Sequence, residues 1–324
     1  MMPSDLRQNA AMQRTAPRRF PPRPSAVLAA LAAIGLVLVG CQSAEEPDPT
    51  AEPSPSEASL APSAELDEAL LDQRWTVLFV GTDANAAREA AEEIPNADAL
   101  MLVSLSADQS ELTMVSLPRD TVDVPLPDGG TWTGKINSLY AEQGLEATVG
   151  AMETLYGVPI DGHVALDMDD FTALVDSVDG VDVDPPEPLV DPIVNLDLEA
   201  GPQEIDAVTA NGYVRTRVDQ DYGRMGRQQE VLLGVVERLT DPDRDVDVAE
   251  LVENLDSLET DLPMAELPTL LELASRASDA EVTQLVIEPP LIVFEGDRGD
   301  GRGYILEPDV EAIRAEVQAL IGED

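Results

Sequence analysis

Histidine, cysteine, aromatic residues and positive charge are all scarce in this 324-residue sequence. The single Cys excludes an intramolecular disulfide framework and a Cys-based zinc site, and the single His excludes sites and triads that need several imidazoles. Lys and Arg number 19 against 64 Asp and Glu, and the resulting charge of −45 argues against a nucleic-acid partner. A hydrophobic content of 44% with only 3% aromatic residues nevertheless predicts a sizeable, aliphatic core.

The first 40 residues have the pattern of a bacterial lipoprotein signal peptide. Several arginines precede the apolar run at 26–40, which is shorter than the roughly 20 residues that a transmembrane helix needs. Leu38-Val39-Gly40-Cys41 resembles a lipobox, so we expect cleavage before Cys41 and a lipid anchor on its thiol. The alternative is a short membrane anchor with an incidental cysteine.

Residues 41–73 are predicted to form an acidic, proline-rich tether. Prolines alternate there with Glu, Asp, Ser and Ala, a composition that favours a semi-extended chain of about 3 Å per residue. The folded part is then 74–324, with recognisable motifs over about 75–240 and a C-terminal part at 241–324.

Apolar patterning predicts a single α/β domain with a mixed central sheet and helices on both faces. Continuous apolar runs at 75–80, 100–105 and 112–117 are typical of buried strands, and the short link at 106–110 indicates a hairpin. Helices are predicted at 85–93, 143–156 and 168–178, the last two ending at Gly157 and Gly180. Further helices carry the apolar faces that follow Gln228 and Pro308, the proline standing where a helix begins.

Four of the few basic residues lie within 13 positions: Arg215, Arg217, Arg224 and Arg227. Residues 212–214 predict a strand, after which a two-residue step would place the first two on one face. The other two are three apart at the start of a helix and would also share a face. A strand end that meets a helix start is a common phosphate site, and guanidinium groups match phosphate oxygens. The alternative is that these arginines pair with carboxylates such as Asp219 and Asp221.

Carboxylates occupy comparable strand ends. Asp83 follows the first predicted strand, Asp98 precedes the second, and Pro118-Arg119-Asp120 closes the third. Acids beside an arginine cluster suggest Mg²⁺ bridging to a diphosphate, because Mg²⁺ is usually held by one or two carboxylates plus phosphate oxygens. Asp is also a common turn residue, so a plain turn stays open as the alternative.

A series of short motifs, in order from about residue 75 to 239, resembles the LytR–CpsA–Psr family. They are GTD (81–83), DALML (98–102), SLPRDT (116–121), KIN (135–137), GVPID (157–161), GVDV (180–183), YVRTR (213–217) and DYGRMGRQQ (221–229). The family usually has Arg and then Ser or Thr where this chain has Asn96 and Ala97, so one guanidinium is absent from that strand edge. Arg88 is near enough in sequence to reach the same place.

The resemblance implies a three-layer α/β/α enzyme of the cell envelope. Such enzymes transfer a phosphate-linked glycopolymer from a polyprenyl-pyrophosphate carrier to peptidoglycan, with pyrophosphate cleavage as a possible side activity. It also implies a place at the outer face of the cytoplasmic membrane, where the lipid on Cys41 would replace the family's usual transmembrane anchor.

The same resemblance implies the site residues. Mg²⁺ on the pyrophosphate would be held by Asp83 and Asp98, and Asp98 is also the candidate base toward the acceptor hydroxyl. Charge on the leaving polyprenyl phosphate would be stabilised by Arg119, Arg215, Arg217 and Arg227, and substrate binding completed by Asp83, Lys135, Arg224 and Gln228.

Two other functions stay open. Asn96 motivates a lipoprotein that binds pyrophosphate-linked glycans without turnover, and the lipobox with its tether is also the layout of phosphorylated-solute-binding lipoproteins.

His163 begins a predicted strand and is interpreted as structural. The alternate aspartates of 241–247 lack the Gly and Glu of a calcium loop and are interpreted as a solvated acidic loop.

Overall fold

The computed structural model describes residues 66–84, 88, 94–241, 243–244, 246, 258–277 and 280–322. The predicted signal peptide, Cys41 and most of the tether lie outside the described residues, as do nearly all of the helix predicted at 85–93 and much of the acidic loop. Among the helices of the described ranges, none combines the length and the apolar character needed to cross a membrane.

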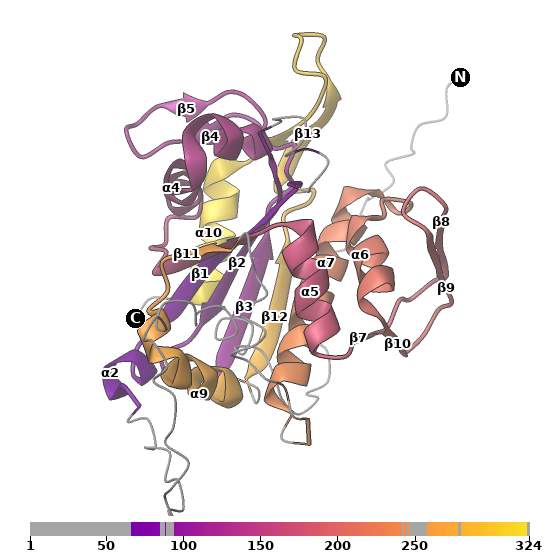
Figure 1. Cartoon of the computed structure of the whole chain (residues 1–324). Coiled ribbons are helices and arrows are strands. Elements are labelled where there is room, and N and C mark those ends of the chain that lie inside the picture. The colour runs from indigo at the N-terminus through magenta and orange to yellow at the C-terminus, as the bar shows by residue number, and fades with distance from the viewer. Residues whose placement is uncertain are drawn as a thin grey trace, which may run out of the picture.

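A six-stranded mixed sheet forms the middle layer (Figure 1). Its strands, in spatial order, are β11 (Glu259–Thr260), β6 (Gly162–Leu166), β1 (Trp75–Thr82), β2 (Ala97–Leu105), β3 (Glu111–Ser116) and β12 (Glu281–Val286). The three central strands are antiparallel neighbours, while β6 runs parallel to β1 and β12 parallel to β3. This arrangement confirms the predicted mixed sheet, the three apolar strands and the hairpin at 106–110.

Helices cover both faces of the sheet (Figure 1). One face carries α4 (Ile136–Tyr156) and α10 (Val310–Ile321). The other carries α5 (Met168–Ser177), α6 (Ala207–Arg215), α7 (Gln220–Thr240) and α9 (Leu267–Ala277). The predicted three-layer α/β fold is therefore correct.

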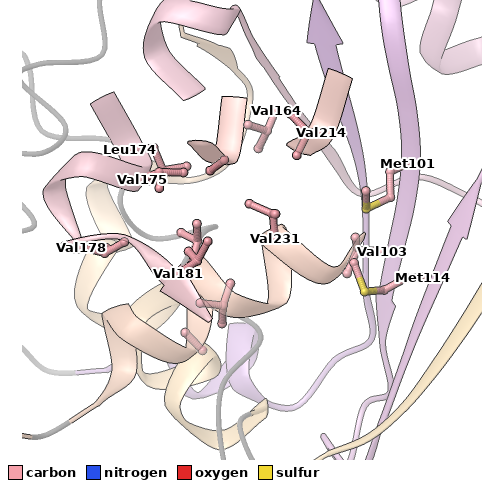
Figure 2. Close-up of a cluster of buried hydrophobic side chains, with 14 of the residues drawn as sticks. Met101, Val103, Met114, Val164, Leu174, Val175, Val178, Val181, Val214 and Val231 are labelled. Atoms are coloured by element: carbon pink, nitrogen blue, oxygen red, sulfur yellow. The ribbon is translucent and has the colours of Figure 1, made fainter. Parts of the chain in front are cut away.

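Two aliphatic cores follow from the alternation of side chains along the strands. Val77 of β1 belongs to the core under α5, α6, α7 and α9, and its neighbour Leu78 to the core under α4 and α10. Figure 2 shows Met101, Val103 and Met114 of the sheet within the same cluster as Val231 of α7. Packing of the 220–240 helix on the sheet thus fixes where its first turns lie relative to the strand ends.

One predicted element is wrong. Residues 212–214 are not a strand but lie in α6, which begins after Asp206, whose carboxylate caps the helix by accepting a hydrogen bond from Thr209 N (2.8 Å). The helix buries Tyr213 and Val214. Arg215 is its last residue and Arg217 lies in the link to α7, so the predicted shared strand face does not exist.

Other boundaries move by a few residues. The helix predicted at 143–156 begins at Ile136 and is kinked at Gly144, although it ends at Gly157 as expected, with φ 69° at that glycine. The helix placed after Gln228 begins at Gln220. Pro308 is the last residue of a strand, and Asp309 caps the helix that follows.

A short helix precedes β1, inside the segment predicted as tether. Residues 68–71 form helix α2 (Glu68–Leu71), whose Leu71 is buried in the core. Trp75 Nε1 donates to Leu70 O at 2.8 Å, which ties this turn to β1. The folded part therefore begins before residue 74.

Short hairpins surround this frame. They are β4 (Val124–Pro125) with β5 (Thr131–Trp132), β7 (Val181–Val183) with β10 (Gln203–Ile205), β8 (Leu189–Asp191) with β9 (Leu196–Leu198), and β13 (Ile292–Asp297) with β14 (Tyr304–Pro308). The β13–β14 hairpin projects beyond the end of the sheet, on the side where β1 and β3 end (Figure 1).

Candidate active site

The predicted acids and Arg119 do lie at one edge of the sheet. β1 and β3 end there and β2 begins there, because β2 is antiparallel to both. Asp83 N donates to Asn96 O at 3.1 Å, just before Asp98. Gly81 pairs with Ala99 and Thr82 with Ala97, so Asp98 is the extra residue of a β-bulge. A bulge turns a side chain out of the regular alternation of its strand.

Asp98 forms an ion pair with Arg119 through Oδ2 and Nη1. Two buried atoms of this pair, Asp98 Oδ1 and Arg119 Nε, have no hydrogen-bond partner among the described residues. Burial lowers the pKa of the Arg119 guanidinium, but the charge and hydrogen bond of Asp98, together with the charges of Asp120 and Asp221, outweigh burial and raise the pKa overall. The Arg119 guanidinium therefore stays charged, and the pair leaves one acceptor and one donor of the described residues for a ligand.

Arg224 connects α7 to this pair. Its buried guanidinium donates to the backbone O of Asp98 (3.0 Å) and to both carboxylate oxygens of Asp221 (2.9 and 3.1 Å). Arg217 Nε lies 3.2 Å from Asp221 Oδ1. We call Asp98, Arg119, Arg217, Asp221 and Arg224 the arginine–carboxylate cluster. Three guanidinium groups meet two carboxylates there, which leaves one positive charge in excess.

Electrostatics within the cluster favour an added anion. Burial lowers the pKa of Arg217, and the neighbouring charges of Arg224 and Arg119 lower it further. Burial raises the pKa of Asp221, but the hydrogen bond and charge of Arg224, together with the charges of Arg217 and Arg119, outweigh burial and lower the pKa overall. Arg217 is thus a cation close to two others, Arg119 and Arg224, and 39% of its side chain is exposed. A bound phosphate would relieve this repulsion.

Arg227 makes its hydrogen bonds within the protein. Its guanidinium is buried and donates to Tyr213 O (2.9 Å), Thr216 O (2.6 Å) and Asp219 Oδ2 (2.6 Å). Gln228 Nε2 donates to Val214 O at 3.3 Å. Both side chains therefore fasten the end of α6 to α7 and fix the link that carries Arg217.

Arg215 stands apart from the cluster. It is exposed, and Nη1 donates to Asn211 Oδ1 one helical turn earlier at 3.3 Å. Within the described ranges no hydrogen bond or ion pair joins Arg215, Arg227 or Gln228 to Asp98. The structure thus brings together Asp98, Arg119, Arg217 and Arg224 of the predicted site, while these three residues lie around it.

Two further ion pairs flank the cluster. Lys135 Nζ lies 2.8 Å from Asp120 Oδ1, and Arg88 Nη1 lies 2.9 Å from Asp83 Oδ1. Arg88 therefore reaches the strand edge, as its sequence position suggested. The alternative of pairing with local acids is also realised in part, since Asp219 and Asp221 do bind cluster or neighbouring arginines.

The donor set fits one Mg²⁺ shared with a phosphate. No group of three or more His, Cys, Asp or Glu side chains able to hold a metal occurs in the described part of the chain. Mg²⁺ does not need such a cage when phosphate oxygens and water supply its other ligands. Asp98 Oδ1, which is buried and has no partner among the described residues, is an oxygen suited to that role.

A cavity of about 440 Å³ adjoins the cluster. It lies between the start of α7 and the β13–β14 hairpin, and its walls include Arg217, Asp221, Tyr222, Glu295 and Tyr304. The sequence indicated Asp221 as a charge partner and placed Asp221 and Tyr222 in the 221–229 motif, but it did not indicate Glu295 or Tyr304. Tyr222 and Glu295 are 73 residues apart, so only the tertiary fold brings them together.

Comparison with protein families gives one match. The model of the LytR_cpsA_psr family matches residues 39–314, which include the whole sheet and the cluster.

His163 lies outside the site. Its backbone N donates to an oxygen of Asp261 at 2.7 Å, in keeping with a structural role.

The individual relatives share only moderate sequence identity with this chain. TagV of Bacillus subtilis, a polyisoprenyl-teichoic acid–peptidoglycan teichoic acid transferase, is 26% identical over 257 residues, which are 75% of this chain and 64% of TagV. LcpB of Corynebacterium glutamicum, a probable cell wall biosynthesis protein, is 38% identical over 135 residues, 41% of this chain and 32% of LcpB. The chain thus spans less than two thirds of either relative.

Solved structures share the fold. The crystal structure of B. subtilis TagV has a TM-score of 0.62 and 25% identity, and the match covers 77% of this chain and 98% of that one. The structure of TagT bound to LIIa-WTA has a TM-score of 0.60 at 23% identity and covers 80% and 94% of the two chains.

Proposed function

This chain belongs to the LytR–CpsA–Psr family, and from that premise we propose that it transfers a phosphate-linked glycopolymer from a polyprenyl-pyrophosphate carrier to peptidoglycan. The names of its relatives support a transfer of this class. The arginine–carboxylate cluster supports it from the residues themselves, because it offers an excess of guanidinium groups at a strand edge open to a diphosphate.

The proposed reaction is a phosphoryl transfer. A sugar hydroxyl of peptidoglycan attacks the phosphorus on the glycan side of the pyrophosphate. The bond from that phosphorus to the bridging oxygen breaks, polyprenyl phosphate leaves with the electron pair, and a phosphodiester joins the glycopolymer to peptidoglycan. The hydroxyl proton passes to solvent, which reaches this partly exposed edge.

The chain contributes position and positive charge, which dominate catalysis of phosphoryl transfer. Arg217 is proposed to bind oxygens of the pyrophosphate that become more negative as the leaving group departs. Arg119 offers its unpartnered Nε to the same group. Arg224 holds Asp98 and Asp221 in place, and Arg227 holds the Arg217-bearing link.

Asp98 is proposed to hold Mg²⁺ through Oδ1, with Asp83 at the neighbouring strand end. When bound, the ion would neutralise charge on the pyrophosphate. One oxygen cannot bind a cation and accept a proton at the same time, so we favour the ligand role for Asp98 over that of base. Arg119 fixes the other oxygen and orients the carboxylate.

Attachment and location are proposed on the N-terminal sequence. A lipid on Cys41 would hold the enzyme at the outer face of the cytoplasmic membrane, where the carrier and peptidoglycan meet. Retention of the full chain in the membrane fraction, and its release in Cys41→Ser, would test this anchor.

The excess positive charge of the cluster is the observation that carries the proposal. The test is incubation of the full chain with a polyprenyl-pyrophosphate glycopolymer, Mg²⁺ and peptidoglycan. Wall-linked polymer that is lost in Arg217→Ala supports the transferase. Tight binding of the carrier without turnover would instead support the second candidate, a binding lipoprotein, which Asn96 favours because it supplies no guanidinium to the edge. Absence of both would contradict each candidate.

A further inference from the structure

The cavity beside the cluster is lined by two chemically different groups of residues. Arg217 and Asp221 belong to the arginine–carboxylate cluster. Glu295 of β13 and Tyr304 of β14 come from the hairpin, and Tyr222 comes from the first turn of α7; we call this second group the hairpin end of the cavity. The volume of about 440 Å³ is within the range of small-ligand sites, roughly 300–1,000 Å³.

Glu295 organises the hairpin end. Tyr222 Oη donates to Glu295 Oε2 at 3.2 Å, and Tyr304 Oη donates to Glu295 Oε1. Glu295 pairs with Leu306 across the hairpin, and Tyr304 is two residues from Leu306, so these side chains share one face. Burial, and then the Glu295 hydrogen bond, raises the pKa of Tyr304 to about 12. Its hydroxyl therefore stays a donor at neutral pH.

Charge at this end disfavours a polyanion. Asp120 on the cavity wall is paired with Lys135, and Asp221 with Arg217 and Arg224. Glu295, in contrast, receives hydrogen bonds from the two tyrosines, and no cation of the described residues forms an ion pair with it. An anionic glycopolymer would be repelled there, whereas a neutral sugar would not.

The chemistry of the walls suits a sugar ring. Tyr304 lines the cavity and is 50% exposed, and a tyrosine ring combines apolar area with a polar end. A carboxylate accepts hydrogen bonds from hydroxyl and amide donors. A ligand that combines apolar C–H faces with several donors, and carries no phosphate, meets all of these conditions.

We propose that this cavity binds a neutral amino-sugar glycan strand, and that it is the acceptor subsite of the enzyme. Tyr222 and Tyr304 contact the sugar ring, Glu295 accepts hydrogen bonds from it, and the next sugar presents its hydroxyl toward Arg217. The assignment as acceptor subsite rests on the proposed transfer. It places donor and acceptor at opposite ends of one cavity, with the reacting phosphorus between them.

The test uses the full chain and a neutral probe, a β-1,4-linked tetramer of N-acetylglucosamine, with binding measured by calorimetry. We expect the wild type to bind, and Tyr304→Ala and Glu295→Gln to bind at least about tenfold more weakly, the effect of losing a hydrogen bond or ring contact. Val293→Ala is the control, since Val293 is exposed on the same strand and outside the cavity. Equal melting temperatures would exclude unfolding as the cause.

Transfer kinetics separate this inference from the proposed function. In the reconstituted reaction, Tyr304→Ala should raise the acceptor concentration for half-maximal rate about tenfold and leave that for the donor unchanged. If transfer proceeds while neither variant changes probe binding or acceptor dependence, the subsite is wrong and the transferase stands. If the tyrosine-dependent binding is found without any transfer, the neutral-glycan site stands and the transferase fails. Preference of the cavity for a glycerol-phosphate oligomer over the neutral tetramer would overturn the proposal.

Discussion

Asp98 and Arg119 form an ion pair at the sheet edge, and each keeps one buried polar atom, Oδ1 and Nε, without a partner in the described part of the chain. Buried polar atoms are nearly always satisfied, so an unsatisfied acceptor beside an unsatisfied donor calls for an explanation. A phosphate-bound Mg²⁺ would satisfy the acceptor, and a phosphate oxygen the donor. These two atoms are therefore the ones through which the proposed Mg²⁺ and phosphate would bind.

Asp98→Asn should weaken Mg²⁺ binding more than it destabilises the fold. Loss of the carboxylate charge removes the Mg²⁺ ligand, and we expect transfer to fall by roughly 10²–10³, as for the loss of other preorganised charge-stabilising groups. The Mg²⁺ concentration that half-saturates carrier binding should rise, a readout independent of turnover.

Asp128→Asn is the matched control for this change. Asp128 is exposed in a turn, where its carboxylate accepts from Gly130 N at 2.8 Å, away from the cluster. An unchanged Mg²⁺ titration in Asp98→Asn would remove Asp98 from the metal site.

Arg217→Ala and Arg215→Ala should differ, although the two arginines are two positions apart. Arg217 belongs to the cluster, so its loss should lower transfer by about two orders of magnitude. Arg215 bonds only to Asn211 among the described residues and is exposed, so we expect a change of less than about threefold. Rates measured at saturating donor decide the matter. Equal losses in both variants would return Arg215 to the catalytic set.

Arg227→Ala should act first on stability. It leaves the carbonyls of Tyr213 and Thr216 without their donor and Asp219 without its cation. A cost of about 3 kcal/mol is expected, which lowers the melting temperature by roughly 5–10 °C in a domain of this size.

The comparison variant is Arg276→Ala. Arg276 forms an exposed pair with Glu272 on α9 at 2.8 Å, and such surface pairs contribute about 0–1 kcal/mol. A melting temperature of Arg227→Ala as high as that of Arg276→Ala would mean that Arg227 serves the substrate rather than the fold.

Much of this site follows from local sequence signals. The strand ends can be predicted from the sequence because the apolar runs end before Asp83 and Pro118. Antiparallel pairing of neighbouring strands then brings Asp98 to the same edge. The sequence also predicted the apolar face of the helix after Gln228. What these signals could not supply was the bulge at Asp98, which depends on the register of two strands.

The segment 207–215 shows why the rest was missed. Tyr213 and Val214 favour strands, but the cap at Asp206 and burial of this face against the core favour a helix, and packing decides. The sequence indicated Asp221 as a possible partner of the arginines, but only the structure shows that Arg217 and Arg224 both bind it. The cavity joins residues far apart in sequence and has no local signature.

Asp221→Asn should change the dependence of stability on pH. The pKa of Asp221 in the folded state is lowered from 3.8, because Arg224, Arg217 and Arg119 outweigh the effect of its burial. A depressed folded pKa contributes stability that is complete above the unfolded pKa and is lost as pH falls through about 4 and below. The free energy of unfolding of the wild type should therefore fall more steeply below about pH 4 than that of the variant. Parallel curves would show that Asp221 is not held ionised by the arginines.

The route of the phosphorus tests the central proposal most directly. A carrier with ³²P at the glycan-side phosphorus is incubated with the full chain, Mg²⁺ and peptidoglycan, and the products are separated and the radioactivity of each is counted. Attack at that phosphorus predicts a labelled phosphodiester on peptidoglycan and an unlabelled polyprenyl monophosphate, both lost in Arg217→Ala. Release of polyprenyl pyrophosphate that retains the label, or binding without any product, would contradict it.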